Sequence, residues 1–289
     1  MNILVTGAAG KTGNAVINAL LSRNVEVCAF VRSEMQAQTI HKSHVVKFVV
    51  GDLRNLEDLK NATRKVDAIY FICPNVTPDE LEIGKLLVTA ALENNVKRFV
   101  YHSVLHPQIE AMPHHWQKMR MEEFLFTSGL DFTILQPCAY MQNVLAGWEK
   151  ISQESVYNVP YSIHSRLSIV DLYDIGEVAA RIIAENGHSN AIYELAGPDP
   201  LSQIDIADVI STVLKKPVTA KEISRAIWID QARKGGMQSI EIDLLIRMFE
   251  YYEKYGLIGN PLVLKTLLGR EPTQFVEFAK QHLCSPGVQ

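Results

Sequence analysis

Short apolar segments alternate with segments of helical periodicity through the first half of this chain of 289 residues. Short runs rich in Val, Ile and Phe are typical of strands buried in a parallel sheet. They predict strands over 3–5, 25–31, 45–50, 66–72, 99–103 and 132–135. Helical spacing predicts helices over 34–41, 77–94 and 113–127, around 16–21 and from 55–59 onward. This alternation predicts an α/β fold, a doubly wound parallel (Rossmann) sheet with helices on both faces.

One helix start is predicted in more detail, at Thr77-Pro78-Asp79-Glu80. Threonine is a common helix cap, and proline is favoured in the first helical position. An acid three residues after the cap, here Glu80, completes a capping pattern. We therefore expect Thr77 to cap this helix.

The alternation loosens after Pro137. The pattern predicts a helix over 139–151, loop and short strand over 157–167, an amphipathic helix over 171–185 and a strand over 192–195. The remainder is predicted to be mainly helical. We therefore expect a Rossmann domain formed by 1–137 plus 165–197. A smaller, mainly helical C-terminal portion on the substrate side would comprise 138–164 plus 198–289.

Composition narrows the class of protein. The net charge of −4 and pI of about 6.1 argue against direct binding of nucleic acid. Cys28, Cys73, Cys138 and Cys284 lack metal or redox spacing, so buried reduced thiols and no metal site are expected. Met1-Asn2 leads straight into an apolar strand, and no apolar run reaches the ~18 residues of a membrane span. These features predict a cytoplasmic protein without a membrane partner.

The stretch from Val5 to Gly13 can be compared with two phosphate-binding patterns. Gly10-Lys11-Thr12 resembles the end of a P-loop, but that loop needs a glycine five residues before the Gly-Lys pair, where Val5 stands. The alternative pattern places glycines at 7, 10 and 13, after a strand and before a helix, which is typical of dinucleotide binding. The predicted cofactor contacts in this turn are Thr6, Gly7, Ala9, Gly10, Lys11, Thr12 and Gly13.

Residues that follow other strands indicate which dinucleotide binds. The second strand ends at Arg32 instead of the acid typical of NAD sites, and a guanidinium can pair with a 2′-phosphate. With Lys11 as a second cation, NADP(H) is favoured over NAD(H). Asp52 could accept from the adenine amino group, and Leu53, Ile72, Cys73 and Pro74 are further predicted contacts at strand ends. For the Cys73 thiol, packing is preferred to reactivity.

The order of these motifs resembles a known family. The matching segments are Thr6-Gly7-x-x-Gly10-x-x-Gly13, Val31-Arg32, Gly51-Asp52, Tyr101-x-Ser103, Thr133-Ile134-Leu135-x-Pro137, Met141-x-Asn143, Asp174-Ile175-Gly176 before a helix, Tyr193-x-Leu195-x-Gly197-Pro198 and Leu268-Gly269-Arg270-x-Pro272. Over nearly the whole chain they resemble the NmrA-like branch of atypical short-chain dehydrogenases. The resemblance implies either an NADPH-dependent reductase of quinones, azo dyes or phenolic compounds, or a non-catalytic NADP(H) redox sensor.

The catalytic pair of most short-chain dehydrogenases is missing, because no tyrosine has a lysine four residues later. His114 and Lys118 have that spacing on the corresponding helix, so Lys118 could hold the nicotinamide ribose and His114 could donate a proton. The alternative is an exposed helix start with a solvated lysine. Ser103, at the end of the fifth strand, could orient substrate or bond locally, and His106 is a further proton donor.

Residues just past the sixth strand are candidates for the substrate pocket. Tyr140, Asn143 and Trp148 combine flat apolar surface with polar tips, which suits a planar, quinone-like ligand. The alternative is that Met141 and Trp148 pack the C-terminal helices onto the sheet. Gln136 stands where many relatives carry arginine, and its neutral amide weakens the case for a charged substrate contact at this position. We expect a reductase first and a sensor acting through a protein partner second. Sugar-nucleotide epimerisation is disfavoured by the missing tyrosine, and a monomer or weak homodimer is expected.

Overall fold

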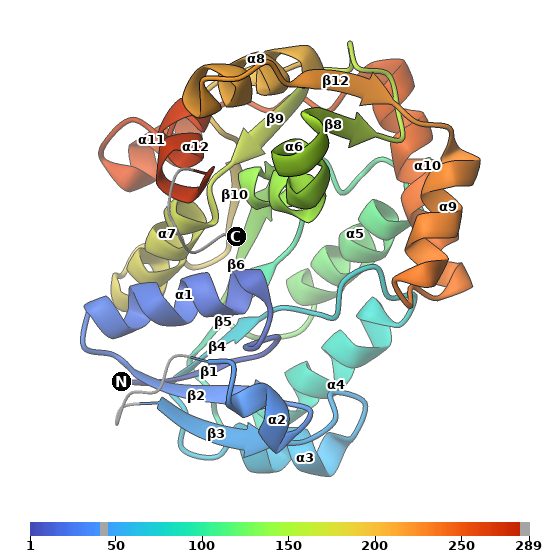
Figure 1. The fold of residues 1–289 in the computed structure, drawn as a ribbon. Coiled ribbons are helices and arrows are strands. Elements are labelled where there is room, and N and C mark those ends of the chain that lie inside the picture. The colour runs from blue at the N-terminus through green and yellow to red at the C-terminus, as the bar shows by residue number, and fades with distance from the viewer. Residues whose placement is uncertain (41–45, 284–289) are drawn as a thin grey trace. The chain divides into compact units, whose positions relative to one another are not determined.

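The computed structural model describes residues 1–40 and 46–283, so the ends of two predicted elements, at 41 and 45, and Cys284 lie outside the described residues (Figure 1). The chain divides into two compact units. Unit 1 comprises Met1–Gln108, His115–Pro137 and Leu172–Tyr193; unit 2 comprises Ile109–His114, Cys138–Asp171 and the chain from Glu194 onward. The domain boundaries drawn from the sequence, which kept 165–197 whole, stay a prediction.

Unit 1 is built on a seven-stranded sheet of order β10-β6-β5-β4-β1-β2-β3, and pairing is parallel from β6 to β3. Its strands are β1 Asn2–Val5, β2 Glu26–Val31, β3 Val46–Val50, β4 Ala68–Phe71, β5 Arg98–His102, β6 Phe132–Pro137 and β10 Ala191–Leu195. The order reverses between β1 and β4, which is where such sheets bind ligands. The predicted doubly wound α/β fold is confirmed.

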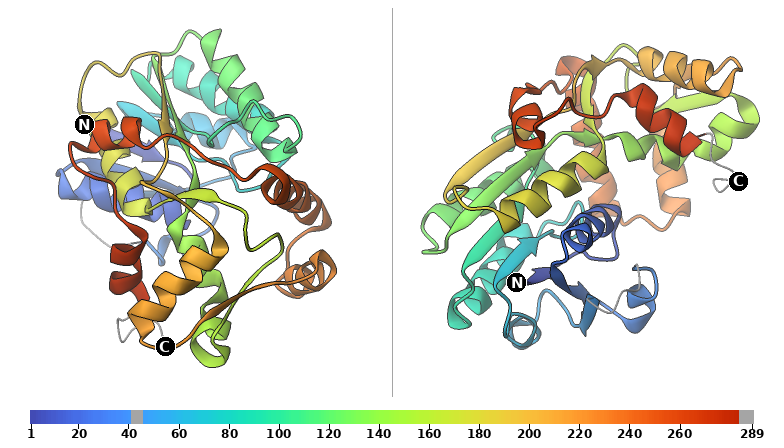
Figure 2. Two further views of the ribbon diagram at one scale, coloured as in Figure 1. Left: turned by 90° about the horizontal axis from the view of Figure 1, so that it is seen from above. Right: turned by 90° about the vertical axis from the view of Figure 1, so that its left-hand side faces the viewer.

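Helices cover both faces of this sheet (Figure 2). They are α1 Lys11–Ser22, α2 Glu34–Ala37, α3 Leu56–Ala62, α4 Glu80–Glu93, α5 Pro113–Phe126 and α7 Leu172–Ala184. In Figure 1, α1 lies beside α7, and α4 lies beside α3. The Asp174-Ile175-Gly176 motif, predicted to precede a helix, lies inside α7.

The predicted cap of α4 is wrong. The helix begins at Glu80 with Asp79 as its N-cap residue, and Thr77 Oγ1 accepts from the N–H of Asp79, at 3.3 Å, and not from a helix N–H of the described residues. Glu80 is fully buried, its Oε1 accepts from Lys118 and Tyr101, and its Oε2 has no hydrogen-bond partner among the described residues, so its side chain satisfies no helix N–H. The physical reason is the buried ammonium of Lys118, which attracts this carboxylate into the protein interior.

Aromatic side chains fill the core between the sheet and the helices α4 and α5. Phe71 stacks on Tyr101 with ring centroids 5.5 Å apart, and it also contacts Phe99 at 5.9 Å. All three rings are fully buried. Large buried rings of this kind dominate core stability and fix the strands from which the polar site residues project.

Unit 2 contains small sheets and most of the C-terminal helices. One sheet joins β11 Pro200–Leu201, β9 Leu167–Val170 and β7 Ala139–Tyr140; the other joins β12 Thr219–Glu222 and β8 Val156–Val159. Its helices are α6 Trp148–Glu154, α8 Gln203–Leu214, α9 Arg225–Lys234, α10 Ser239–Tyr255, α11 Leu262–Leu268 and α12 Phe275–Leu283. No helix within the described ranges has the length and apolar character to cross a membrane.

The predicted helix over 139–151 is wrong in its first half. Ala139–Tyr140 forms β7, Met141–Gly147 is a 3-10 helix, and an α-helix begins only at Trp148. Tyr140 pairs in register with Val170 of β9, so tertiary strand pairing overrides the local helical pattern. Gly197 supports the same region, since a Cβ there would lie 1.7 Å from the Ile169 carbonyl oxygen.

Candidate functional site

The turn between β1 and α1 requires its glycines for different reasons. Gly7 has φ +59°, and an added Cβ would lie 3.0 Å from Ile72 Cβ. The Gly10 N–H donates to the Gly7 carbonyl oxygen at 2.9 Å, closing the turn. At Gly13 a Cβ would lie 2.3 Å from that same oxygen. Gly7 and Gly13 therefore permit the tight turn and the close packing of helix on turn.

The N-terminus of α1 is suited to a pyrophosphate. Gly10 is its N-cap residue, no side chain caps the helix, and its first turn contains no acidic residue. Gly10 and Lys11 are exposed, whereas Ala9 and Thr12 are half-buried. A helix N-terminus with N–H groups and partial positive charge of this kind favours an anionic phosphate group.

Thr6 connects this turn to the end of β4. Its Oγ1 donates to the Ile72 carbonyl oxygen and accepts from the Ile72 N–H, both at 2.8 Å. The hydroxyl proton of Thr6 is thus used within the protein. We infer that Thr6 positions the segment from Ile72 to Pro74 beside the glycine turn.

The other predicted cofactor residues lie at the ends of β2, β3 and β4. Arg32 is exposed, and its backbone N–H donates to Gln36 Oε1 at 2.9 Å. Asp52 is also exposed, with Oδ1 accepting from the Arg54 N–H at 2.9 Å, while Leu53 is buried. Burial raises the pKa of the Cys73 thiol well above its usual value, which agrees with a packing role for this side chain.

Lys118 lies in a buried ion pair. Its Nζ is 2.6 Å from Glu80 Oε1 and 3.3 Å from the His102 carbonyl oxygen. The Tyr101 hydroxyl donates to the same Glu80 oxygen at 2.7 Å. The alternative of a solvated lysine is therefore wrong, since Lys118 is 8% exposed. Glu80 was not predicted as a site residue from the sequence.

Ser103 belongs to a second buried polar group. Its Oγ donates to Glu122 Oε1, and Gln136 Nε2 donates to both Glu122 oxygens, at 3.0 and 2.8 Å. Burial raises the pKa of Glu122, although the bonds from Ser103 and Gln136 and the charge of Lys118 act in the opposite direction. Glu122, which lies one helical turn after Lys118 on α5, was likewise not predicted from the sequence.

The histidines near this site are buried or strained. His114 and His115 are 7% and 0% exposed, so the alternative of an exposed helix start is wrong. His115 Nδ1 lies 3.3 Å from the carbonyl oxygen of His106, a loop residue with φ +54°. Burial lowers the pKa of His115 to about 4 and that of His102 to about 3. Roles for His106 and His114 as proton donors stay predictions.

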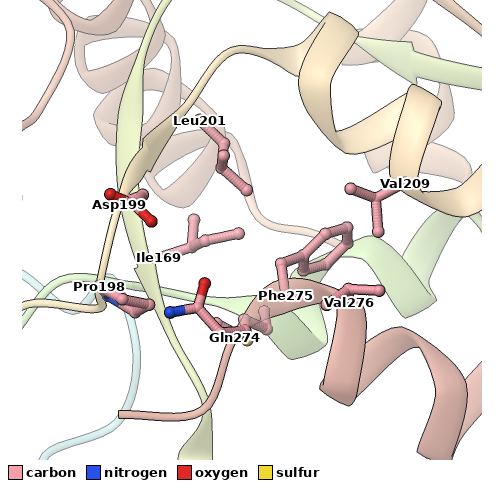
Figure 3. A pocket seen from close by; sticks show the side chains of 9 residues that line it. Ile169, Pro198, Asp199, Leu201, Val209, Gln274, Phe275 and Val276 are labelled. Atoms are coloured by element: carbon pink, nitrogen blue, oxygen red, sulfur yellow. The ribbon is translucent and has the colours of Figure 1, made fainter. Parts of the chain in front are cut away.

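Tyr140 and Asn143 line a cavity of about 50 Å³ in unit 2 with Tyr157, Tyr161 and Gln203. Trp148 begins α6. A second cavity in unit 2, of about 110 Å³, is lined by Ile169, Leu201 and Phe275 among others (Figure 3). Ligand pockets usually measure ~300–1,000 Å³, so neither cavity alone holds a drug-sized ligand.

The parallel sheet and its glycine turn define the chain as a Rossmann-type protein with a dinucleotide-binding turn. A match to the NmrA-like family over residues 1–279 then identifies it more closely: the chain belongs to the NmrA-like family.

Similar proteins of known activity cover the whole chain. It is 28% identical to the NAD(P)H azoreductase of Xenophilus azovorans over 99% of both chains. It is 24% identical to quinone oxidoreductase 2 of Escherichia coli (strain K12), covering 95% of this chain and 96% of that protein. The crystal structure of an NADPH-dependent quinone oxidoreductase from Escherichia coli with NADPH matches at a TM-score of 0.84, with 25% identity over 98% of this chain and 100% of that one.

Proposed function

We propose that this protein is an NADPH-dependent reductase that transfers hydride to a small, conjugated, quinone-like acceptor. The observation that carries the proposal is the pair of buried polar groups at the end of β5, around Lys118 and Ser103. Buried charges are costly and cluster at functional sites. Relatives that match end to end, an azoreductase and a quinone oxidoreductase, support the same chemistry.

The chain's own residues suit this reaction in distinct ways. The N-terminus of α1 would hold the pyrophosphate, Arg32 the 2′-phosphate and Lys118 the nicotinamide ribose. Bound NADPH supplies the hydride. Ser103 would orient the acceptor oxygen, and Tyr140, Asn143 and Trp148 would line the acceptor's pocket. Quinones suit a site without Tyr-x-x-x-Lys, because the anion formed on reduction is stabilised and needs little acid catalysis.

A screen of the purified protein tests this function. NADPH oxidation should be followed at fixed cofactor concentration against quinones, azo dyes and enones, with NADPH binding measured separately. We expect turnover with quinones or azo dyes. Tight NADPH binding with no turnover on any acceptor would contradict the proposal and favour a second function, a non-catalytic redox sensor. The missing tyrosine and the engagement of Lys118 by Glu80 favour that alternative.

The preference for NADPH over NADH forms part of the proposal and is tested at Arg32. Arg32→Asp should raise the Kd of NADPH about 10–100-fold, because a charged hydrogen bond contributes about 1.5–3 kcal/mol. The Kd of NADH should change much less. Arg64→Asp is a matched control, since Arg64 is exposed and precedes β4, at the opposite end of the parallel strands. Equal loss of both cofactors would show that Arg32 does not read the 2′-phosphate.

The proposal also includes three further expectations: a monomer or weak homodimer, a cytoplasmic location and a planar small-molecule substrate. Light scattering at several protein concentrations would determine the oligomeric state.

A further inference from the structure

A buried chain of hydrogen bonds connects three elements of unit 1 at the end of β5. Glu122 of α5 accepts from Ser103, the residue after β5, and from Gln136 of β6. Ser103 and Glu122 are each 2% exposed, and Gln136 is 7% exposed. Both carboxyl oxygens therefore have a partner from the sheet.

The arrangement is unusual for a purely structural carboxylate. Within the described part of the chain, Glu122 forms no ion pair, because the neighbouring cation Lys118 is paired with Glu80. A buried carboxylate without a directly paired cation destabilises the folded protein, so such a group is typically either protonated or retained for a role in the reaction. The two Gln136 contacts suit a group that alternates between acid and carboxylate, since they stabilise the carboxylate when the proton has left.

The surroundings of Glu122 shift the pKa of its carboxyl group in both directions. Lys118, on the same helix, lowers the pKa of Glu122, as do the bonds from Ser103 and Gln136. Burial acts against them and prevails, so the carboxyl keeps its proton to a higher pH than a free glutamate. Tyr101 from β5 and Glu80 from α4 are further ionisable groups near Lys118, and they are hydrogen-bonded to one another. The Cys73 thiol and the His102 imidazole also lie within reach of the Lys118 charge.

Resting on the proposed reductase function, we propose that Glu122 supplies the proton of the reaction through Ser103, in place of the missing tyrosine. Bound NADPH would supply a hydride, whose electron pair forms a new C–H bond on the conjugated acceptor while the acceptor's π-electron pair shifts to its oxygen. When Glu122 is protonated it donates to Ser103 Oγ, so the Ser103 hydroxyl turns toward the acceptor oxygen, gives its proton to that oxygen and receives the proton of Glu122. The products are the reduced acceptor, oxidised cofactor and a Glu122 carboxylate, which solvent reprotonates. Glu122 acts through Ser103 and is a positioning residue in this sense.

The test compares pH profiles of kcat for the wild type and for Glu122→Gln. The wild type should lose activity as pH rises through the Glu122 pKa, because the donor is then deprotonated. Glu122→Gln keeps the size and polarity of the side chain but does not titrate, so that fall should disappear. With enones, whose reduced oxygen is more basic, kcat should drop about 100-fold or more. With quinones the drop should be smaller.

Glu123→Gln is the matched control, because Glu123 is the next residue of α5 and is exposed. Its pH profile should match the wild type. Ser103→Ala should flatten the profile in the same way as Glu122→Gln, and Ser103→Thr should restore it. If Glu122→Gln does not fold, Glu122→Asp can be tested instead. It keeps a titrating carboxyl group, so kcat should still fall with rising pH, but at a different pH from the wild type.

The outcomes separate this inference from the proposed function. An active wild type whose pH profile is unchanged by Glu122→Gln overturns the relay and leaves the reductase intact. An equal loss of activity for enones and quinones also overturns it. A wild type that fails to oxidise NADPH with every acceptor removes the reductase function, and the relay with it.

Discussion

The local sequence around Glu80 predicted a role in helix capping, and the structure shows a different role. An acid at a helix start is typical of capping, yet the Glu80 carboxylate is fully buried against the Lys118 ammonium. Burying both charges is costly, and the cost is offset by their pairing, by the bond from Tyr101 to Glu80 and by the bond from Lys118 to the His102 carbonyl oxygen. Removing both partners together should therefore cost less than the sum of the two single removals.

This expectation defines a double-mutant cycle. Glu80→Gln and Lys118→Met should each lower the free energy of unfolding by about 3–5 kcal/mol, because each leaves a buried charge unpaired. The double variant should lose less than the sum by about 2 kcal/mol. In Glu80→Gln the new amide oxygen can still accept from the Tyr101 hydroxyl, so that bond is kept. Urea denaturation measures all four proteins.

The exposed pair Lys85–Glu82, with 2.9 Å between Nζ and Oε1, gives a control on the same helix α4. Its cycle should yield a coupling of about 0.5 kcal/mol or less, as for other exposed pairs. Equal coupling in the two cycles would contradict the buried pair's special role.

Two site residues were missed because neighbours in space were not neighbours in sequence. Glu122 could have been noticed, since it follows Lys118 by four residues on one helix. Its partners Ser103 and Gln136 come from separate strands, and only the sheet brings them together. By contrast, the glycine turn was identifiable because all its parts are contiguous.

At the scale of elements, the strands of the central sheet were predictable because each is a short segment rich in apolar residues. The structure of segment 139–151 could not be predicted in the same way. Met141, Val144 and Trp148 fit a helical spacing whether the backbone forms a 3-10 helix or an α-helix. The first two residues of this segment form strand β7 because they pair with β9, which is distant in sequence.

Helix α7 depends on one close approach to α1. A Cβ on Gly176 would lie 2.7 Å from the carbonyl oxygen of Ala15, an atom of helix backbone that cannot rotate away. Gly176→Ala should thus lower the free energy of unfolding by about 1–3 kcal/mol through overpacking. This loss opposes the gain of up to about 1 kcal/mol that alanine brings to a helix interior.

Urea midpoints of the two proteins check this expectation. Gly147→Ala serves as the control, because a Cβ at Gly147 meets nothing within 4 Å. A Gly176→Ala protein as stable as the wild type would show that α1 and α7 can separate without cost.

At the scale of the whole molecule, the buried histidines set how the protein responds to acid. His102 and His115 have pKa values lowered by burial to about 3 and about 4, so both are neutral in the folded state. The unfolded chain takes up protons below about pH 6.5, the ordinary value for histidine. Stability is therefore full above that pH and is lost as pH falls toward 4 and then 3.

The expected slope is a loss of about 1.4 kcal/mol per pH unit for each histidine. Glu122 acts with the opposite sign, because its raised pKa makes the folded state bind more protons than the unfolded state just above the ordinary glutamate value. In that pH range, one such group can cancel at most the contribution of one histidine to the pH slope of the free energy of unfolding. Between about pH 6.5 and 5 the two histidines should therefore dominate.

Urea denaturation at about pH 7.5, 6.5, 5.5 and 5 measures this slope. His102→Asn and His115→Asn should each remove about half of it, because asparagine keeps a polar group near Nδ1 without titrating. Tyr70, whose hydroxyl lies 2.7 Å from His102 Nδ1, keeps a partner in the first variant. The exposed His164 provides the control, and His164→Asn should leave the slope unchanged. A slope that persists in the double variant would assign the acid sensitivity to carboxylates elsewhere in the chain.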